Sequence, residues 1–509
     1  MENLFLVPFL ALMATGTISG SCSQTNIVLI ITDDQDLTLG GLTPLVKTQN
    51  IIANMGVIYT NAFVTTPICC PSRASILSGQ YQHNHRTLNN SVSGGCSGLH
   101  WQQHVEPQTW PALLHQAGYT TFYAGKYLNQ YGYKKTGGAA HIPAGWDWWI
   151  GLVGNSRYYN YSLSVNGTAV LHSDDYLTDV IKAYGLEFLR QRHVAEKNFL
   201  MVLAPPAPHA PFTPAPEYND HYKNVKAMRT PNFNIPVFQD KHWLLQMPPS
   251  PLPDSMLPEL DRVYRKRWET LLSVDDLVES IVTRLDSLGL LDSTHIILTS
   301  DHGYHVGQFG LPWDKRQPYE MDIRIPLMIR GPGFPHKQMD IRPVLNIDFA
   351  PTFLAMAGLE APAWMDGVSF FPFPQTIVNN GTGMDRKFLI EYHGEGSRKT
   401  VSPDCPYDQS DTLSNCIPEQ KCKCQDSKNN TYMCVRHLEP HITADVTPSH
   451  DFVFCKFRDS ENFTEAYDLN VDPYQLNNLA PSLSPAIGNK YISWMDHLKF
   501  CSGLLCHLH

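Results

Sequence analysis

At residues 68–79 the sequence reads Ile68-Cys69-Cys70-Pro71-Ser72-Arg73-Ala74-Ser75-Ile76-Leu77-Ser78-Gly79. Pro71 suits the first position of a helix, because it lacks the N–H group that the first turn leaves unpaired, and Gly79 can end that helix. Cys69 therefore lies just ahead of a predicted helix, where free N–H groups and the helix dipole favour anions. Arg73 adds a planar guanidinium group that suits an oxyanion. The alternative interpretation is one half of a structural disulfide followed by an ordinary helix.

Several apolar runs have the character of strands that are buried on both faces of a parallel sheet. They lie at residues 26–32, 119–124, 199–203, 295–300 and 325–330. Helical patterns alternate with these runs, and such alternation is typical of a doubly wound α/β sheet. The sequence therefore predicts an α/β fold with a doubly wound sheet.

Charged or titratable side chains follow several of these predicted strands, where open α/β sheets gather their ligands. They are Asp33, Asp34, Lys126, His209, Asp301 and His302. One such residue is uninformative, but this many at the same kind of position is the pattern expected of an α/β active site.

Four of these residues form a candidate metal site: Asp33, Asp34, Asp301 and His302. Three carboxylates favour a hard divalent cation such as calcium or magnesium. The softer imidazole alone would favour a transition metal. The alternative is that Asp33 and Asp34 only cap a following helix.

The stretch at 68–79 resembles the sulfatase signature C-x-P-S-R-x-x-x-L-x-G, which it matches at Cys69, Pro71, Ser72, Arg73, Leu77 and Gly79. This resemblance implies an alkaline-phosphatase-like fold and hydrolysis of a sulfate ester. It also implies that a formylglycine-generating enzyme oxidises Cys69 to formylglycine in the endoplasmic reticulum. The register selects Cys69, because a start at Cys70 would place Pro71 one position too early.

The same resemblance assigns roles to the residues at the strand ends. It implies one Ca²⁺, held by Asp33, Asp34, Cys69 as formylglycine, Asp301 and His302. The residues that it implies in catalysis are Cys69, Arg73, Lys126, His209 and Lys315.

One position departs from the family pattern. Many sulfatases carry a His two residues after the Lys that matches Lys126, and that His helps to break down the covalent intermediate. Leu128 stands there in this chain. Another base must therefore serve, and the sequence leaves His85 and His305 as alternatives.

The composition is that of an ordinary globular protein, with a formal net charge of -10 over 509 residues. No global positive field is available for nucleic acid, so an anionic substrate must be held by local charges. Residues 4–18 are apolar and precede small residues, which predicts a signal peptide over 1–22. No later stretch predicts stable membrane insertion. We expect a catalytic domain over 23–385 and a disulfide-rich C-terminal subdomain over 386–509.

The twelve Cys residues agree with an oxidising compartment. Eight lie after residue 400, and among them Cys501 and Cys506 could close a small loop. The other pairings stay open. Cys422 and Cys424 could suggest zinc, although a disulfide is the better prediction for a secreted chain. Runs at 452–457 and 465–469 predict short strands of an antiparallel sheet in this part.

Six sequons predict N-glycosylation at the surface, at Asn89, Asn160, Asn166, Asn380, Asn429 and Asn462.

Further stretches refine the resemblance, and they lie at residues 33–36, 81–85, 125–129, 265–268, 275–279 and 429–434. On these stretches the chain is most similar to family members that remove the 6-O-sulfate of N-acetylglucosamine 6-sulfate from non-reducing ends of heparan and keratan sulfate. Those members act in glycosaminoglycan degradation in the lysosome. The alternative is the group of extracellular heparan sulfate 6-O-endosulfatases, which carry a long basic insertion. The corresponding stretch here, about 399–425, is short and not strongly basic. Two further alternatives are a phosphodiesterase with a Ser or Thr nucleophile and a glycan-binding protein without catalysis.

Overall fold

The computed structural model describes residues 25–191, 196–236, 239–373, 385–395, 423–440, 450–459 and 461–508. The predicted signal peptide over 1–22, the sequon at Asn380 and Cys422 lie outside the described residues.

The centre of the fold is a ten-stranded sheet. In spatial order its strands are β13 (Gln338–Asp340), β2 (Val57–Tyr59), β12 (Leu327–Arg330), β9 (Thr294–Ser300), β1 (Asn26–Thr32), β8 (Phe199–Ala204), β4 (Thr120–Gly125), β5 (Trp148–Leu152), β6 (Tyr161–Val165) and β7 (Thr168–His172). From β9 to β5 every neighbouring pair is parallel. The predicted α/β fold is confirmed, and each predicted strand of this sheet is present.

The strand predicted at 325–330 is β12, but it runs antiparallel to β9. A parallel neighbour requires a crossover connection, usually a helix. The chain between β9 and β12 forms only the short β10 (His305–Val306), β11 (Trp313–Asp314) and α8 (Glu320–Ile323). It therefore returns from the carboxyl end of β9 and re-enters the sheet in the opposite direction.

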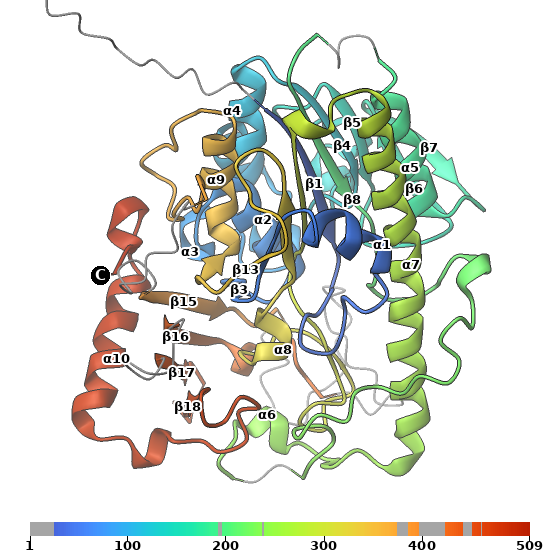
Figure 1. Ribbon diagram of the computed structural model, residues 1–509. Coiled ribbons are helices and arrows are strands. Elements are labelled where there is room, and N and C mark those ends of the chain that lie inside the picture. The colour runs from blue at the N-terminus through green and yellow to red at the C-terminus, as the bar shows by residue number, and fades with distance from the viewer. Residues whose placement is uncertain are drawn as a thin grey trace, which may run out of the picture.

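Helices cover both faces of the large sheet (Figure 1). Ile27, Leu29 and Ile31 of β1 face a cluster that includes α2, α4 and α9, whereas Val28 and Ile30 face α5 and α7. The bounds of the described α-helices besides α8 are α1 (Val46–Thr48), α2 (Cys69–Ser78), α3 (Gln82–His85), α4 (Trp110–Gln116), α5 (Leu177–Phe188), α6 (Trp243–Gln246), α7 (Leu257–Ser287), α9 (Phe349–Met356) and α10 (Pro485–Leu498). In the part of the chain that the structure describes, no helix is long and apolar enough to cross a bilayer.

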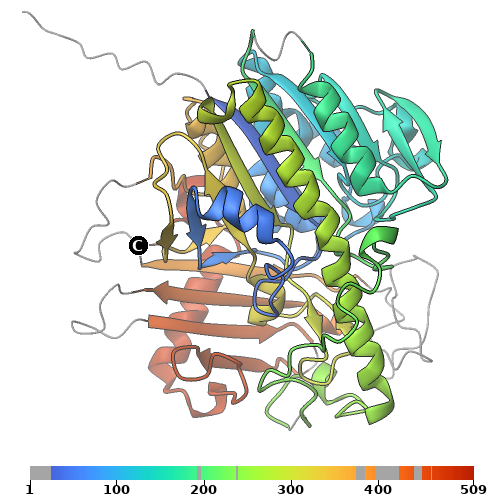
Figure 2. The same cartoon turned by 45° about the vertical axis from the view of Figure 1, so that its right-hand side comes forward.

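A separate four-stranded antiparallel sheet forms the C-terminal part (Figure 2). Its strands are β15 (Arg386–Tyr392), β16 (Tyr432–Glu439), β17 (His450–Phe457) and β18 (Thr464–Asp468). The strands predicted at 452–457 and 465–469 are thus β17 and β18. A short pair of strands, β3 (Ala62–Phe63) and β14 (Val344–Leu345), completes the described β-structure.

Disulfides join Cys70 to Cys96, Cys434 to Cys455 and Cys501 to Cys506. The last pair is the predicted terminal loop. Cys424 is also disulfide-bonded, so its sulfur is not a free thiolate for zinc.

An ion pair joins the small sheet to α3. The Nδ1 atom of His83 lies 2.8 Å from Oε1 of Glu391, and Nε2 lies 3.1 Å from the carbonyl oxygen of Cys501. Since both ring nitrogens face acceptors, the imidazole is held in its charged form. Burial opposes that charge, but Glu391 outweighs burial and raises the pKa of His83. Burial would raise the pKa of Glu391, but His393, whose Nε2 lies 3.9 Å from Oε2, and His83 lower it to about 2.

A His83→Gln substitution is expected to destabilise the protein in a pH-dependent way. A raised histidine pKa contributes stability that is present below the unfolded value and lost as pH rises through the folded value. The loss should be about 2 kcal/mol near pH 5 and clearly smaller near pH 9. Thermal unfolding at both pH values measures it. His115→Gln is the control, because His115 and Asp147 form an exposed pair that should contribute little. Equal losses at both pH values for His83→Gln would contradict this account.

Candidate active site

The carboxyl ends of the parallel strands bring the predicted residues together. In the order β9-β1-β8-β4 these ends lie side by side. Asp33 and Asp34 follow β1, Lys126 follows β4, and Asp301 and His302 follow β9. All five are buried, which requires that their charges be compensated within the protein.

Helix α2 points its first turn at this cluster, and it begins earlier than the sequence predicts. Cys69, not Pro71, is its first residue, and Ile68 is the N-cap with extended backbone. The Oδ1 atom of Asn90 accepts a hydrogen bond of 2.9 Å from the N–H of Cys70. This external acceptor satisfies one of the N–H groups that the first turn leaves unpaired. Gly79 ends the helix with a φ of 71°, as predicted.

Asp33 is surrounded by donors. Nζ of Lys126 lies 2.9 and 2.8 Å from its two carboxylate oxygens, and Nη2 of Arg73 lies 3.5 Å from Oδ1. Ser156, which no sequence pattern marked, donates its hydroxyl to Oδ2. Burial alone would raise the pKa of Asp33, but Lys126 and His209 hold it well below its usual range.

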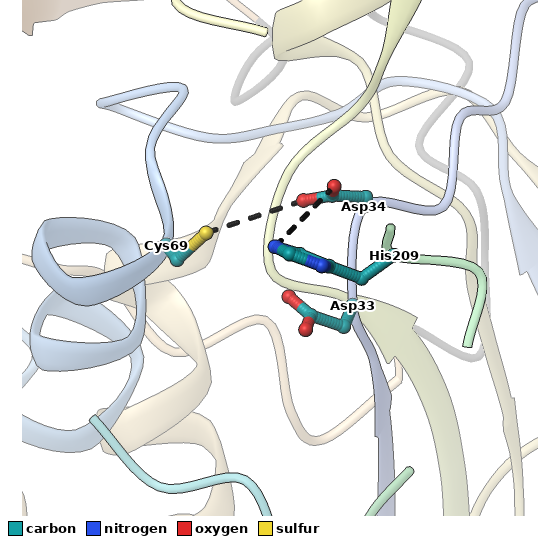
Figure 3. A group of neighbouring side chains, drawn as sticks. All are labelled: Asp33, Asp34, Cys69 and His209. Carbon is teal, nitrogen blue, oxygen red and sulfur yellow. Dashed lines mark hydrogen bonds and ion pairs between the residues drawn. The ribbon is translucent and has the colours of Figure 1, made fainter. Parts of the chain in front are cut away.

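Asp34 forms the centre of the cluster, with a φ of 69°. Nζ of Lys315 lies 2.8 Å from both of its carboxylate oxygens. Nε2 of His302 lies 3.4 Å from Oδ1, and Nε2 of His209 lies 3.9 Å from Oδ2. Figure 3 shows dashed lines from Asp34 to His209 and to Cys69, whose sulfur lies 4.0 Å from Oδ1. One carboxylate thus touches residues from four separate segments.

Asp301 links α2 to the end of β1. Nε of Arg73 donates to Oδ2 over 2.8 Å, and the N–H of Asp34 donates to Oδ1 over 3.0 Å. Burial raises the pKa of Asp301 to about 6, against the opposite effects of His302 and Arg73.

His302 has a fixed tautomer. Its Nδ1 lies 2.9 Å from the carbonyl oxygen of Gly303, which can only accept, so Nδ1 carries the proton. Nε2 faces inward, 3.3 Å from the sulfur of Cys69. Burial opposes its protonation, but in the absence of a cation Asp301 and Cys69 outweigh burial and raise the pKa of His302 to about 9. A cation at Nε2 must therefore displace the proton that Nε2 carries near neutral pH.

Cys69 is buried and is the free cysteine of the described residues. Burial would raise the pKa of its thiol, but Lys126, Lys315 and His302 hold that pKa well below its usual value. Position 69 therefore lies in a positive local field within a net acidic protein, which suits an anionic group bound there.

The donor set fits a single divalent cation of the calcium type. Cys69, Asp301 and His302 have ligand atoms within 4.8 Å of one another, and so do Asp33, Asp34, Cys69 and His209. The separations between His302 and the carboxylate oxygens of Asp34 and Asp301 are 3.4 and 3.7 Å. Ligands at about 2.3–2.6 Å from one Ca²⁺ ion lie at such spacings. The two groups together offer three carboxylates, from Asp33, Asp34 and Asp301, and two imidazoles, from His209 and His302.

The two histidines that the sequence left as alternative bases differ in the structure. His85 uses both ring nitrogens, Nε2 with Ser75 at 3.0 Å and Nδ1 as acceptor from the N–H of Thr87 at 3.1 Å. Burial lowers its pKa to about 3, so it is a structural residue. His305 holds Asp322 through Nδ1 at 2.9 Å, and its buried Nε2 has no hydrogen-bond partner among the described residues. Leu128 lies in the hydrophobic core.

One further residue supports the site from α7. Nη2 of Arg267 donates to the carbonyl oxygen of Asp34 over 2.9 Å and to Oδ1 of Asp36 over 2.6 Å. These bonds hold the turn after β1 in the conformation that presents Asp34.

Of the sequons that the structure describes, Asn160, Asn166 and Asn462 are exposed, and Asn89 and Asn429 are half-buried.

Comparisons with known proteins agree on one family. The family model described as Sulfatase matches residues 25–359. N-acetylglucosamine-6-sulfatase of goat (Capra hircus) is 46% identical over 498 residues, which are 97% of this chain and 86% of that protein. The human protein of that name is 46% identical over 96% of this chain and 87% of its own length. The extracellular sulfatase SULF-1 homolog of Drosophila melanogaster is 41% identical over 74% of this chain but only 34% of its own length.

Among solved structures, the fold matches BT4656 in complex with its substrate D-glucosamine-2-N,6-O-disulfate. The TM-score is 0.66 at 22% identity, and the match covers 93% of this chain and 97% of that one. At this identity the match supports the fold alone.

Proposed function

This chain belongs to the sulfatase family and is a sulfuric ester hydrolase, and from that premise we propose its substrate. It hydrolyses the 6-O-sulfate ester of N-acetylglucosamine 6-sulfate at non-reducing ends of heparan sulfate and keratan sulfate. The observation that carries the proposal is the 46% identity to N-acetylglucosamine-6-sulfatase across nearly the whole chain. The positive field around position 69 supplies the site for the sulfate group.

The proposal includes two additions to the chain. A formylglycine-generating enzyme converts Cys69 to formylglycine, and one Ca²⁺ binds between Asp33, Asp34, Asp301, His302 and residue 69. The hydrated aldehyde supplies one hydroxyl that attacks sulfur and a second that later releases sulfate. The ion adds positive charge where the sulfuryl oxygens bind.

Three basic side chains stabilise charge on the sulfuryl oxygens. Lys126 and Lys315 now hold Asp33 and Asp34, and a bound sulfate competes for the same Nζ atoms. Nη2 of Arg73 is buried and has no hydrogen-bond partner among the described residues. Its nearest anion is Oδ1 of Asp33 at 3.5 Å, and a sulfuryl oxygen can take its place as a closer acceptor. A donor of this kind contributes about 10²–10³ in rate.

Two groups transfer protons. Asp301, whose carboxylate lies in one ligand group with residue 69, accepts the proton of the attacking hydroxyl. His209 donates Nδ1–H to the carbonyl oxygen of Ala210 over 2.6 Å, which leaves Nε2 on the side of Asp34. Burial opposes its protonation, but Asp34 and Asp33 raise the pKa of His209. A protonated His209 gives its proton to the departing sugar oxygen.

Exo-action is favoured over endo-action by the charge of the chain. An endosulfatase must hold a long polyanion on both sides of the cut, which requires an extended basic track. The net charge here is -10, and the basic residues of the site converge on one sulfate position.

We place the protein in the secretory pathway, with the lysosome as its destination and secretion as the alternative. We also keep as proposals the catalytic domain over residues 23–385, the C-terminal subdomain over 386–509 and N-glycosylation at the predicted sequons.

Desulfation of defined heparan sulfate oligosaccharides tests the proposed substrate. We expect release of the 6-O-sulfate from a terminal N-acetylglucosamine 6-sulfate, and little release from an internal one. A matched oligosaccharide with a chemically blocked non-reducing end is the control. If 6-O-sulfate is released at equal rates from oligosaccharides with a free and with a blocked non-reducing end, the endosulfatase alternative replaces this proposal.

A further inference from the structure

Two site residues, Cys69 and Lys315, are each followed by a residue that hydrogen bonds connect to the C-terminal part of the chain. Cys70 follows Cys69, and Arg316 follows Lys315. Between them lies a continuous path of hydrogen bonds in which each member is buried.

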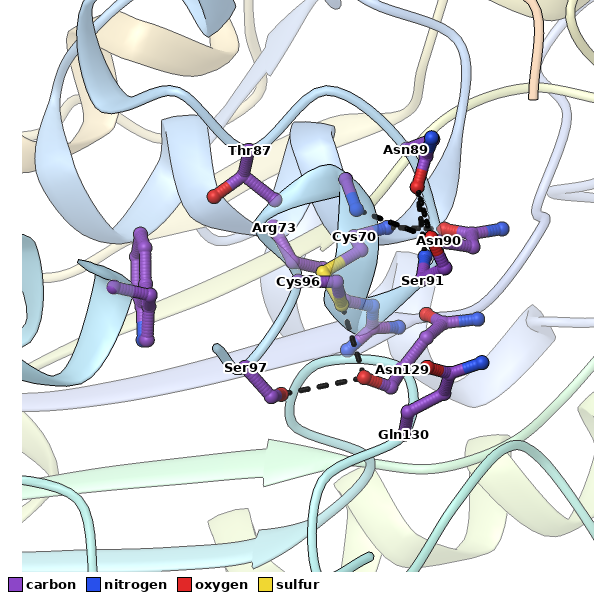
Figure 4. Close-up of a disulfide and its surroundings, with 12 residues drawn as sticks. Cys70, Arg73, Thr87, Asn89, Asn90, Ser91, Cys96, Ser97, Asn129 and Gln130 are labelled. Atoms are coloured by element: carbon purple, nitrogen blue, oxygen red, sulfur yellow. Dashed lines mark hydrogen bonds between the residues drawn. A yellow bond between two sulfur atoms is a disulfide. The ribbon is translucent and has the colours of Figure 1, made fainter. Parts of the chain in front are cut away.

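The path begins at α2. The N–H of Cys70 donates to Oδ1 of Asn90 over 2.9 Å (Figure 4). The N–H of Asn90 in turn donates to Oε1 of Glu395 over 2.9 Å. The other carboxylate oxygen, Oε2, accepts from Nε of Arg316 over 2.7 Å. One carboxylate group therefore holds both the loop that caps α2 and the residue after Lys315.

Arg316 itself is held in an unusual conformation. Its φ is 86°, a region that non-glycine residues rarely adopt and that tertiary contacts must maintain. Its N–H donates to the carbonyl oxygen of Pro67 over 3.2 Å, and its guanidinium group also binds Asp314. This turn directs the preceding Lys315 at Asp34, where both Nζ to oxygen distances are 2.8 Å.

Both ends of the path are thus segments that carry reacting groups, whereas Glu395 itself touches neither Cys69 nor the carboxylates of the metal site in any described contact. Glu395 lies three residues after β15 of the small sheet. The Cys70–Cys96 disulfide also joins this part of the chain to α2 (Figure 4).

We propose that Glu395 is a positioning residue, which sets the placement of Lys315 relative to residue 69 through Arg316 and Asn90. The C-terminal part of the chain thereby completes the geometry of the site rather than only covering it. Loss of the carboxylate releases Arg316 from one side and the Asn90 loop from the other. The inference rests on the proposed function only for its readout, which is hydrolysis of the sulfate ester.

The test uses three single variants of the full-length protein and the double variant of Glu395→Gln with Asn90→Ala. Glu395→Gln keeps the size of the side chain and removes the charge that holds Arg316. Asn90→Ala removes the acceptor for Cys70 and retains the Asn89 sequon. Glu391→Gln is the matched control, because Glu391 is a buried carboxylate of the same segment that binds His83 instead. Formylglycine at residue 69 is quantified by peptide mass, and kcat is expressed per formylglycine.

We expect Glu395→Gln and Asn90→Ala each to lower kcat about ten- to a hundredfold, because small misplacements of reacting groups have effects of that size. KM should change by less than about threefold, and the double variant should be no slower than the slower single variant, because both act through one path. Glu391→Gln should lower the melting temperature and leave kcat unchanged.

A kcat of Glu395→Gln equal to that of Glu391→Gln, or losses that multiply in the double variant, would overturn the inference. If Glu395→Gln does not fold, Glu395→Asp, which keeps the charge but shortens the reach to Arg316 and to the N–H of Asn90, replaces it under the same criterion. A wild-type protein that releases no sulfate would instead overturn the proposed function, so the two failures are distinguishable.

Discussion

The Cys69→Ala variant is expected to lose turnover by about 10⁴-fold or more, because it removes the side chain from which the nucleophile is made. The fold should persist, because the substitution removes only one sulfur atom from α2. The other residues of this helix are buried and keep their contacts. Sulfate release and thermal unfolding, measured on the same preparation, separate the two effects.

Ser78→Ala is the matched control for this substitution. Ser78 lies at the other end of α2 and donates to the carbonyl oxygen of Ala74 over 2.8 Å, away from the site. It should retain wild-type turnover. Wild-type activity in Cys69→Ala would remove residue 69 from the mechanism.

The second large effect is expected from Asp301→Asn, which keeps the shape of the side chain and removes its charge. Asp301 accepts from Arg73, from the N–H of Asp34 and from the N–H of His302, and it is one of three carboxylates available to the cation. We expect loss of bound calcium together with a fall in kcat of about 10²–10³-fold or more. Elemental analysis and kinetics on one preparation measure both.

Asp366→Asn serves as its control. Asp366 is equally buried but binds the N–H groups of Tyr81 and Gly503 instead. It should lower stability and leave calcium content and kcat unchanged. Calcium retained in full by Asp301→Asn, or an active wild-type preparation that contains only zinc, would contradict the proposed metal site.

The positions of the charged residues could be predicted because they follow the strongest pattern in the sequence. The buried strand at 26–32 leaves Asp33 and Asp34 at its carboxyl end, and the strand at 295–300 does the same for Asp301. Parallel pairing of the two strands then brings these residues together. The start of α2 could not be predicted, since Asn90 supplies the acceptor for its first turn from a loop twenty residues later in the chain.

The supporting residues were also beyond sequence patterns. Ser156, Asn90 and Glu395 lie in loops without periodicity, and each acts through one or two specific hydrogen bonds. The direction of β12 depended on the absence of a crossover helix between two strands, which apolar runs alone do not reveal. Between His85 and His305, only the hydrogen-bond partners of the ring nitrogens could show that His85 is structural.

The mass of the peptide that contains residue 69, taken from purified active protein, tests the central claim most directly. The account predicts a peptide lighter than the cysteine form by the difference between a thiol and an aldehyde, with Cys70 in the disulfide to Cys96. The fraction of modified peptide should rise and fall with sulfate release across preparations. An unmodified Cys69 in fully active protein, or the modification on Cys70, would contradict it.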